Sequence, residues 1–90
     1  MKKNLYNEYG GYVMKKESVY YEKLGTILRN ARLDKRMTMK DLCEQIGLKE
    51  VAIHQYETGK RKISLEIFFK VCKILELDVD EVQKELNKYL

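Results

Sequence analysis

The 90-residue chain is predicted to be all-α: a compact domain of five helices preceded by an N-terminal tail. Three observations predict this class. The chain contains no proline, and 44% of its residues are apolar. Apolar residues recur three and four positions apart through most of the chain, and Thr, Ser or Asp stands before several of these stretches, where it can cap a helix. This length is enough for one domain with its own core.

The first 18 residues differ from the rest, because they carry no helical apolar stripe and include the pair Gly10-Gly11. We expect 1–18 to be a poorly ordered tail or arm, and 19–90 to be the domain. Three tyrosines of the tail could pack on the domain or on a partner: Tyr6, Tyr9 and Tyr12. Met14 begins the run MKKE much as the chain begins MKKN, so Met14 is an alternative candidate for the natural start.

The first helix is expected to run from about Ser18 to Lys35. Its apolar residues fall near one face at helical spacing: Tyr21, Leu24, Leu28 and Ala31. That spacing predicts one buried face along the longest helix of the domain.

Two short helices are predicted between residues 38 and 59. Thr38 followed by Asp41 is a capping-box pattern, which marks a helix start, and Gly47 supplies the left-handed residue that ends the helix. The next helix is expected over 50–58, with Ile53 inward, and it ends at Gly59. Helices this short are unstable alone, so the rest of the chain must hold them.

Two further helices complete the domain. Ser64 is placed to cap the fourth helix, and Asp78 with Glu81 repeats the capping-box pattern for a fifth. The fourth helix has a broad apolar surface, made by Leu65, Phe68, Phe69, Val71, Cys72 and Leu75. The apolar residues at the end of the chain could close the core of one chain or pair with a second copy in a dimer: Leu86, Tyr89 and Leu90.

Residues Leu24 to Val82 resemble a known family over about two thirds of the chain. The matching segments are LGTILRNARLDKRMTMKDLCEQIGL, then the pattern IxxYExGKR, then SLEIFFKVCKILELDVDEV. In order and spacing they are similar to the helix-turn-helix domain of the phage Cro and repressor type, the XRE family. The resemblance implies a lambda-repressor-like fold. Three positions depart from the family pattern: Lys49 replaces the usual Ser or Thr cap, Glu50 the usual Gln or Arg, and Ile63 a common proline.

The positive charge is concentrated in the helix-turn-helix part. Residues 29–62 contain nine basic and five acidic residues, whereas 63–90 contain four basic and six acidic residues. A basic surface is the electrostatic requirement for docking on phosphates, although charge alone fits an ordinary solvated surface as well.

The resemblance also implies which residues contact DNA. Glu50, Val51 and Gln55 are expected to contact bases in the major groove: Gln55 could pair with adenine, Glu50 with a cytosine amino group, and Val51 with a thymine methyl. Glu50 could instead cap the helix or balance Lys49. Phosphate contacts are expected from seven residues: Met39, Lys40, Lys49, His54, Thr58, Lys60 and Lys62. Arg32 and Glu57 are expected to form a structural ion pair between the first and third helices.

The predicted function is a sequence-specific regulator of transcription that binds double-stranded DNA as a homodimer, most simply as a repressor. The alternative is an antitoxin or coactivator of the same fold, whose partner would be a toxin or polymerase. No enzyme is indicated, because the chain has one His and lacks a Gly-rich phosphate loop. Cys43 and Cys72 lack metal-site spacing, so neither metal nor cofactor is expected. Without a long apolar run, the protein is expected to be cytoplasmic and free of membranes.

Overall fold

A computed structural model gives the backbone for residues 4–7 and 11–90, and the side chains for residues 19–90. In chain order the elements are β1 (Asn4–Asn7), β2 (Gly11–Met14), α1 (Lys15–Asp34), α2 (Met39–Ile46), α3 (Glu50–Glu57), α4 (Leu65–Leu75), α5 (Val79–Leu86) and the 3₁₀ turn η1 (Asn87–Tyr89). The five α-helices predicted from the sequence are all present.

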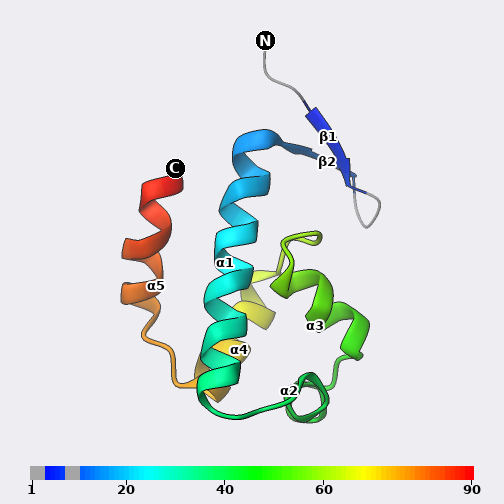
Figure 1. Ribbon diagram of the computed structural model, residues 1–90, viewed down its shortest axis with the longest axis vertical. Coiled ribbons are helices and arrows are strands. Elements are labelled where there is room, and N and C mark those ends of the chain that lie inside the picture. Colours follow the sequence, from blue (N-terminus) through cyan, green and yellow to red (C-terminus); the bar gives the residue numbers. More distant parts are fainter. Residues whose placement is uncertain (1–3, 8–10) are drawn as a thin grey trace.

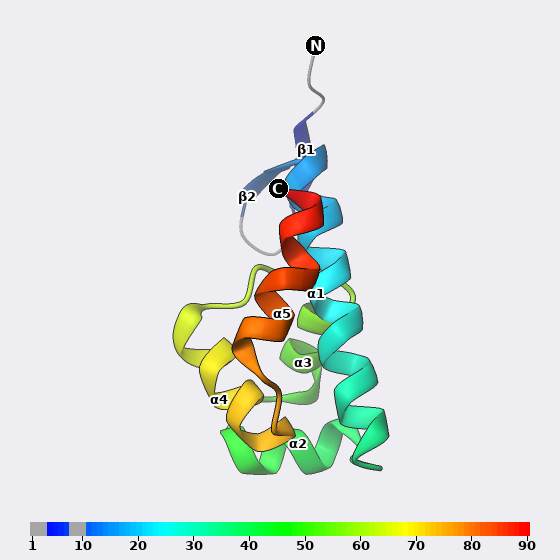
Figure 2. The same cartoon turned by 90° about the vertical axis from the view of Figure 1, so that its left-hand side faces the viewer.

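Helix α1 is the central helix of the domain and packs against α3, α4 and α5. Figure 1 shows it standing through the middle of the molecule, with α5 on the left, α3 on the right and α2 below α3. Figure 2 shows that α4 lies to one side of α1 and above α2. The buried core joins all five helices and consists of Leu24, Leu28, Leu42, Cys43, Ile53, Val71, Leu75, Val82 and Leu86. None of the helices in the described ranges is long and apolar enough to cross a bilayer.

The segment before the domain holds a feature that the sequence did not predict. Strands β1 and β2 pair antiparallel, from Asn4 opposite Met14 to Asn7 opposite Gly11, and β2 leads directly into α1. Helix α1 therefore begins at Lys15, three residues before the expected Ser18. Strands of four residues are too short to produce a clear periodic signal.

That residues 1–18 form a poorly ordered tail stays a prediction. Residues 1–3 and 8–10 lie outside the described residues, as do the side chains of all three tail tyrosines. The boundary between 1–18 and 19–90 remains a prediction.

The helix boundaries follow the predicted caps closely. Thr38 Oγ1 accepts from the Asp41 amide at 3.0 Å, and the Thr38 amide donates to Asp41 Oδ2 at 2.9 Å, so the capping box is complete. Gly47 ends α2 with φ of 83°. Ser64 caps α4 as predicted. Asp78 differs, because its carboxylate accepts from the nearer amide of Asp80 instead of forming a box with Glu81.

The C-terminal apolar residues divide between core and surface. Leu86 is buried in the core, so this residue follows the first of the two alternatives, closing the core of one chain. Tyr89 is half-buried and lies under Lys23, whose Nζ is 5.7 Å from the ring centroid. Leu90 is exposed. Both cysteines are buried, and this burial raises the pKa of the Cys43 and Cys72 thiols.

Candidate nucleic-acid interface

Helix α3 has one buried and one exposed side. Ile53 and Tyr56 are buried against α1 and α2, whereas Glu50, Val51 and His54 are exposed. Val51 is the clearest case, because an apolar side chain of a short helix remains 59% exposed. The structure therefore presents the start and outer side of α3 to solvent, as a helix that enters a DNA groove requires.

Gln55 does not lie with the other two predicted base-contacting residues. It is only 8% exposed, and Arg61 Nη1 lies 3.5 Å from its Oε1, the long limit of a hydrogen bond. The physical reason is the loop after α3, which turns back over the end of the helix so that the amides of Lys60 and Arg61 both donate to the Gln55 carbonyl, at 3.0 and 3.3 Å. In this conformation the side-chain amide oxygen of Gln55 faces Arg61.

Arg61 is a site residue that the sequence analysis missed. Besides the contact with Gln55, its guanidinium lies 5.5 Å from the centroid of the Tyr56 ring, within the range of a cation–π contact. Sequence reasoning selected Lys60 and Lys62 from the basic run 60–62 as phosphate contacts and left Arg61 out. The sequence held one signal for this contact: Tyr56, an aromatic residue, stands five positions before Arg61, on the helix that precedes the loop.

The loop is also fixed against α1. Gly59 has φ of 74°, and a Cβ added there would lie 2.6 Å from the backbone nitrogen of Glu22 on α1. Lys62 Nζ lies 5.7 Å from the ring centroid of Tyr21, again on α1. The basic loop is therefore held in place by the first helix.

The predicted phosphate contacts fall into two groups around α3. At the start of α2, the cap of Thr38 satisfies the Asp41 amide, which leaves the earlier amides of Met39 and Lys40 pointing out of the helix. The Met39 side chain itself packs against the core. The second group surrounds α3 and is exposed: Lys49, His54, Thr58, Lys60 and Lys62.

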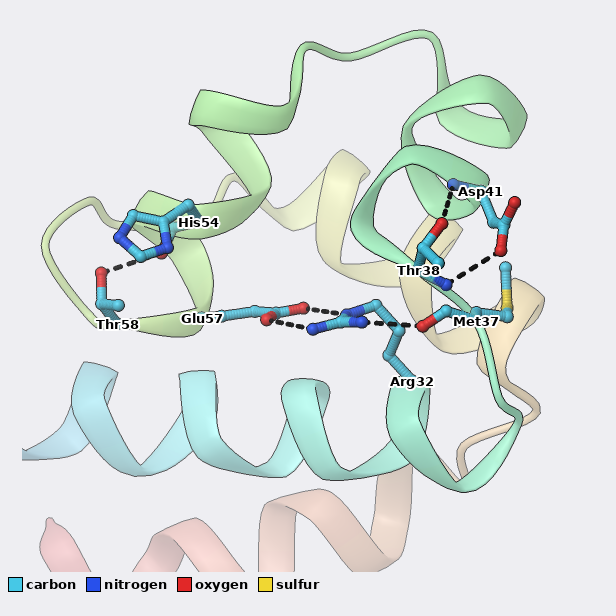
Figure 3. A network of polar contacts seen from close by, with 7 residues as sticks. All are labelled: Arg32, Met37, Thr38, Asp41, His54, Glu57 and Thr58. Carbon is cyan, nitrogen blue, oxygen red and sulfur yellow. Dashed lines mark hydrogen bonds and ion pairs between the residues drawn. The ribbon is translucent and has the colours of Figure 1, made fainter.

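Thr58 is less available as a donor than the others. Its hydroxyl donates to the carbonyl of His54 at 2.8 Å, a local bond that closes the end of α3 (Figure 3). A phosphate could receive this proton only if that bond broke. Lys49, at the other end, is exposed beside the first residue of α3, and its side chain makes no cap bond within the described structure.

The ion pair implied by the resemblance is present and buried. Arg32 Nε lies 2.7 Å from Glu57 Oε2, and Arg32 Nη2 donates to Glu57 Oε1 at 3.0 Å (Figure 3). Arg32 Nη1 donates to the Met37 carbonyl at 2.7 Å. The side chains of the pair are 6% and 3% exposed, and the Glu57 carboxylate raises the pKa of Arg32. A two-bond pair of this kind fixes both position and orientation.

Gly25 is a second residue that the sequence analysis missed. A Cβ added there would lie 2.4 Å from the Glu57 carbonyl oxygen and 2.5 Å from that of Tyr56. Helix α1 and the last turn of α3 therefore approach so closely that only glycine fits between them. A single Gly inside a helical pattern was the available signal.

Comparison with known proteins agrees with this geometry. A family model described as "Helix-turn-helix" matches residues 28–82. A curated relative from Archaeoglobus fulgidus, "Uncharacterized HTH-type transcriptional regulator", is 33% identical over 72 residues. The match covers 79% of this chain but 31% of that relative, so the chain spans about a third of its length.

Two solved structures are similar over most of the chain. The clp gene regulator ClgR from Corynebacterium glutamicum has a TM-score of 0.70 at 30% identity, covering 77% of this chain and 73% of that one. The restriction-modification controller protein C.AhdI from Aeromonas hydrophila has a TM-score of 0.68 at 26% identity, covering 73% of this chain and 96% of that one.

Proposed function

The chain belongs to the helix-turn-helix family of the XRE type, and on this basis we propose that it regulates transcription by binding specific sites on double-stranded DNA. The observation that carries the proposal is the position of α3. Its inner side is anchored by Ile53, Tyr56 and the Arg32–Glu57 pair, while its outer side is exposed and has phosphate-binding candidates at both of its ends. The names of the two similar structures, a gene regulator and a controller protein, support the same class of function.

Val51 and Glu50 are the proposed base-contacting residues. Val51 offers two methyl groups at the exposed start of α3, which suit a thymine methyl in the major groove. The exposed carboxylate of Glu50 can accept a hydrogen bond from a cytosine amino group, and Lys49 beside it offsets its repulsion by phosphates. Gln55 is proposed to act indirectly, by supporting Arg61 and the loop.

The two groups around α3 are proposed to contact the backbone of DNA. The amides of Met39 and Lys40 would bind one phosphate at the positive end of the α2 dipole. The exposed cations Lys40, Lys49, Lys60 and Lys62 would bind others, with His54 and Thr58 between them. Neutralising about four to six phosphates predicts a log–log slope of affinity against salt of about −4 to −5 for one subunit.

We propose that the regulator acts as a homodimer and as a repressor. One eight-residue helix contacts only a few base pairs, which is too little for tight and selective binding. Two copies on half-sites about 34 Å apart would double the contacts on one face of the duplex. Occupation of such a site near a promoter is the simplest way in which a small DNA-binding domain can regulate transcription.

Selection of bound fragments from random duplex DNA, followed by footprinting of the best site, tests the proposal. We expect a two-fold symmetric site, protected in two patches on one face of the helix, with binding that weakens steeply as salt is raised. A purified, folded chain that binds no duplex at low ionic strength would contradict the proposal. A nearly flat salt dependence would contradict the docking through these cations.

A further inference from the structure

One edge of the apolar face of α4 carries side chains that the core does not cover. Leu65 is 68% exposed and Phe69, one turn later, is 48% exposed. The inner side of the same helix is already buried through Val71, Cys72 and Leu75. Leu65, Phe69 and the buried Cys72 follow one another at positions i, i+4 and i+7, so the two exposed residues widen the apolar stripe of α4 beyond the part that the core covers. An exposed apolar extension of this kind is suited to contact with another molecule. We call Leu65 and Phe69 the α4 patch.

The α4 patch is the one place in the described side chains where two large exposed apolar residues share a helix face. The other exposed residues of this type stand on separate elements: Leu33, Val51 and Leu90. The patch is continuous with the core, because the Phe69 ring lies 5.6 Å from the ring of Phe68, which packs against the buried cluster. A partner that covers the patch would therefore pack on side chains that are already in contact with the core.

We propose that a second copy of this chain covers the α4 patch, with the two α4 helices antiparallel across a two-fold axis. This inference rests on the proposed function and identifies the interface of the proposed homodimer. An antiparallel arrangement centred near Ile67 sets Leu65 of one copy against Phe69 of the other. A two-fold interface is self-complementary in this way, because each residue of a contact occurs once on each side.

The charges beside the α4 patch suit a second copy. Glu66 and Lys70 are exposed and form a pair on the same helix, with Lys70 Nζ 3.1 Å from Glu66 Oε1. Antiparallel α4 helices bring Glu66 of each copy toward Lys70 of the other, so two pairs of opposite charges meet along one edge of the apolar contact. The balanced charge here differs from the surplus of cations around α3, which is suited to phosphate.

The position of α4 is compatible with DNA binding by both copies. In Figure 1, α3 packs on α1 at the right-hand side of the molecule, and Figure 2 shows α4 on a different side of α1. The outer sides of α3 and α4 therefore point in different directions. A two-fold axis that crosses the outer side of α4 and runs toward the DNA places both α3 helices against the same face of one duplex, as paired half-sites require.

The interface is expected to be small. Leu65 and Phe69 with their flanking charges supply less than the roughly 800 Å² that each partner buries in a stable interface of standard size. The dimer should therefore form at high protein concentration in solution and more readily on DNA, where two adjacent half-sites raise the effective concentration of the second copy.

The first test measures association by sedimentation over a concentration series, from low micromolar to near millimolar. The wild type should pass from monomer to dimer, and Phe69→Ser and Leu65→Ser should each raise the dimer Kd by roughly tenfold or more. Leu90→Ser and Leu33→Ser are matched controls, because they remove exposed leucines away from the α4 patch. Thermal unfolding at low concentration checks that every variant folds.

A charge test distinguishes contact between copies from contact within one chain. Glu66→Lys and Lys70→Glu should each weaken the homodimer, because like charges then face each other across the axis. A mixture of the two variants should form heterodimers more readily than either variant forms homodimers. The pair within one chain cannot produce this result, since each variant has already lost it.

DNA separates the failure of this inference from the failure of the proposed function. Phe69→Ser should bind a duplex with one half-site as the wild type does, and lose cooperativity on a duplex with two half-sites. A wild type that stays monomeric at the highest concentration and binds two half-sites independently overturns the α4 interface while leaving DNA binding intact. The α4 interface is also overturned if Phe69→Ser dimerises as the wild type does, or if Leu90→Ser weakens the dimer as much as Phe69→Ser does.

Discussion

Arg32 and Glu57 are joined by two hydrogen-bonded contacts, of 2.7 and 3.0 Å, although 25 positions separate them in the chain. The same guanidinium donates to the Met37 carbonyl, which precedes the Thr38 cap of α2. One side chain of α1 therefore fixes the end of α3 and the entry to α2 together. The relative position of these two helices is what presents α3 to a groove, so the pair links stability to the proposed function.

Removal of one partner of this pair should be strongly destabilising. Glu57→Gln leaves the Arg32 cation buried without an opposite charge, and the free energy of unfolding should fall by about 3 kcal/mol. Urea denaturation measures this change, with the exposed Glu44→Gln as the control. Arg32→Met should cost less in the Glu57→Gln background than in the wild type. A loss below about 1 kcal/mol for Glu57→Gln would show that the pair is not a buried constraint.

Gly25→Ala should destabilise the domain although alanine is the better helix former. The added methyl would meet the carbonyl oxygens of Tyr56 and Glu57 at about 2.5 Å, so α1 and α3 must separate. We expect a loss of about 1 to 3 kcal/mol, the usual cost of overpacking, with weaker DNA binding. Asn30→Ala, at an exposed position of α1, is the control and should be neutral or stabilising. Equal stability of both variants would contradict the close approach.

Lys60→Ala and Val51→Ala should affect DNA binding in different ways. Loss of Lys60 should weaken binding to all sequences alike and reduce the magnitude of the salt slope by about 1, because one phosphate contact is removed. Loss of the Val51 methyls should leave the slope unchanged and relax the preference at one position of the site. Titrations against the selected site and its single-base variants at several salt concentrations measure both effects. If both variants lose affinity equally on every duplex, the assignment of base and backbone contacts is wrong.

Gln55 and Arg61 should behave as one unit. Gln55→Ala and Arg61→Ala should each weaken binding to all sequences alike, because both release the loop that carries Lys60 and Lys62. The double variant should lose clearly less affinity than the two single losses combined. Arg61→Lys keeps the charge but not the planar donor group, so it should recover only part of the affinity. A relaxed preference at an adenine in Gln55→Ala, without coupling to Arg61, would instead show a direct base contact.

Stability in acid should depend on Asp41. Hydrogen bonds from the backbone and hydroxyl of Thr38 hold the pKa of the Asp41 carboxyl below its ordinary value. The folded state then binds the proton more weakly than the unfolded chain, so this stabilisation is present above about pH 4 and is lost as pH falls through the lowered value. Between neutral pH and about pH 2, Asp41→Asn should lose less stability than the wild type in urea titrations. Parallel pH profiles of the two proteins would exclude this contribution.

Local features of the fold could be predicted from the sequence. The Thr38 capping box, the Gly47 helix end, the Ser64 cap and the apolar spacing on each helix depend on residues within one or two turns of each other. The hairpin of β1 and β2 was not predicted, because four residues give too little periodicity. The Arg32–Glu57 ion pair was predicted from the family resemblance, not from the spacing of residues.

The sequence by itself determined the five helices, their order and the segment that carries the basic charge, because propensity, capping and charge are properties of neighbouring residues. Only the tertiary structure decided that Gln55 is covered by Arg61, that Gly25 must lack a side chain, and that Leu65 and Phe69 stay exposed while Val71 is buried. Each of these depends on which element packs against which. The spacing of residues along one helix identifies its faces, but it does not identify which neighbour covers each face.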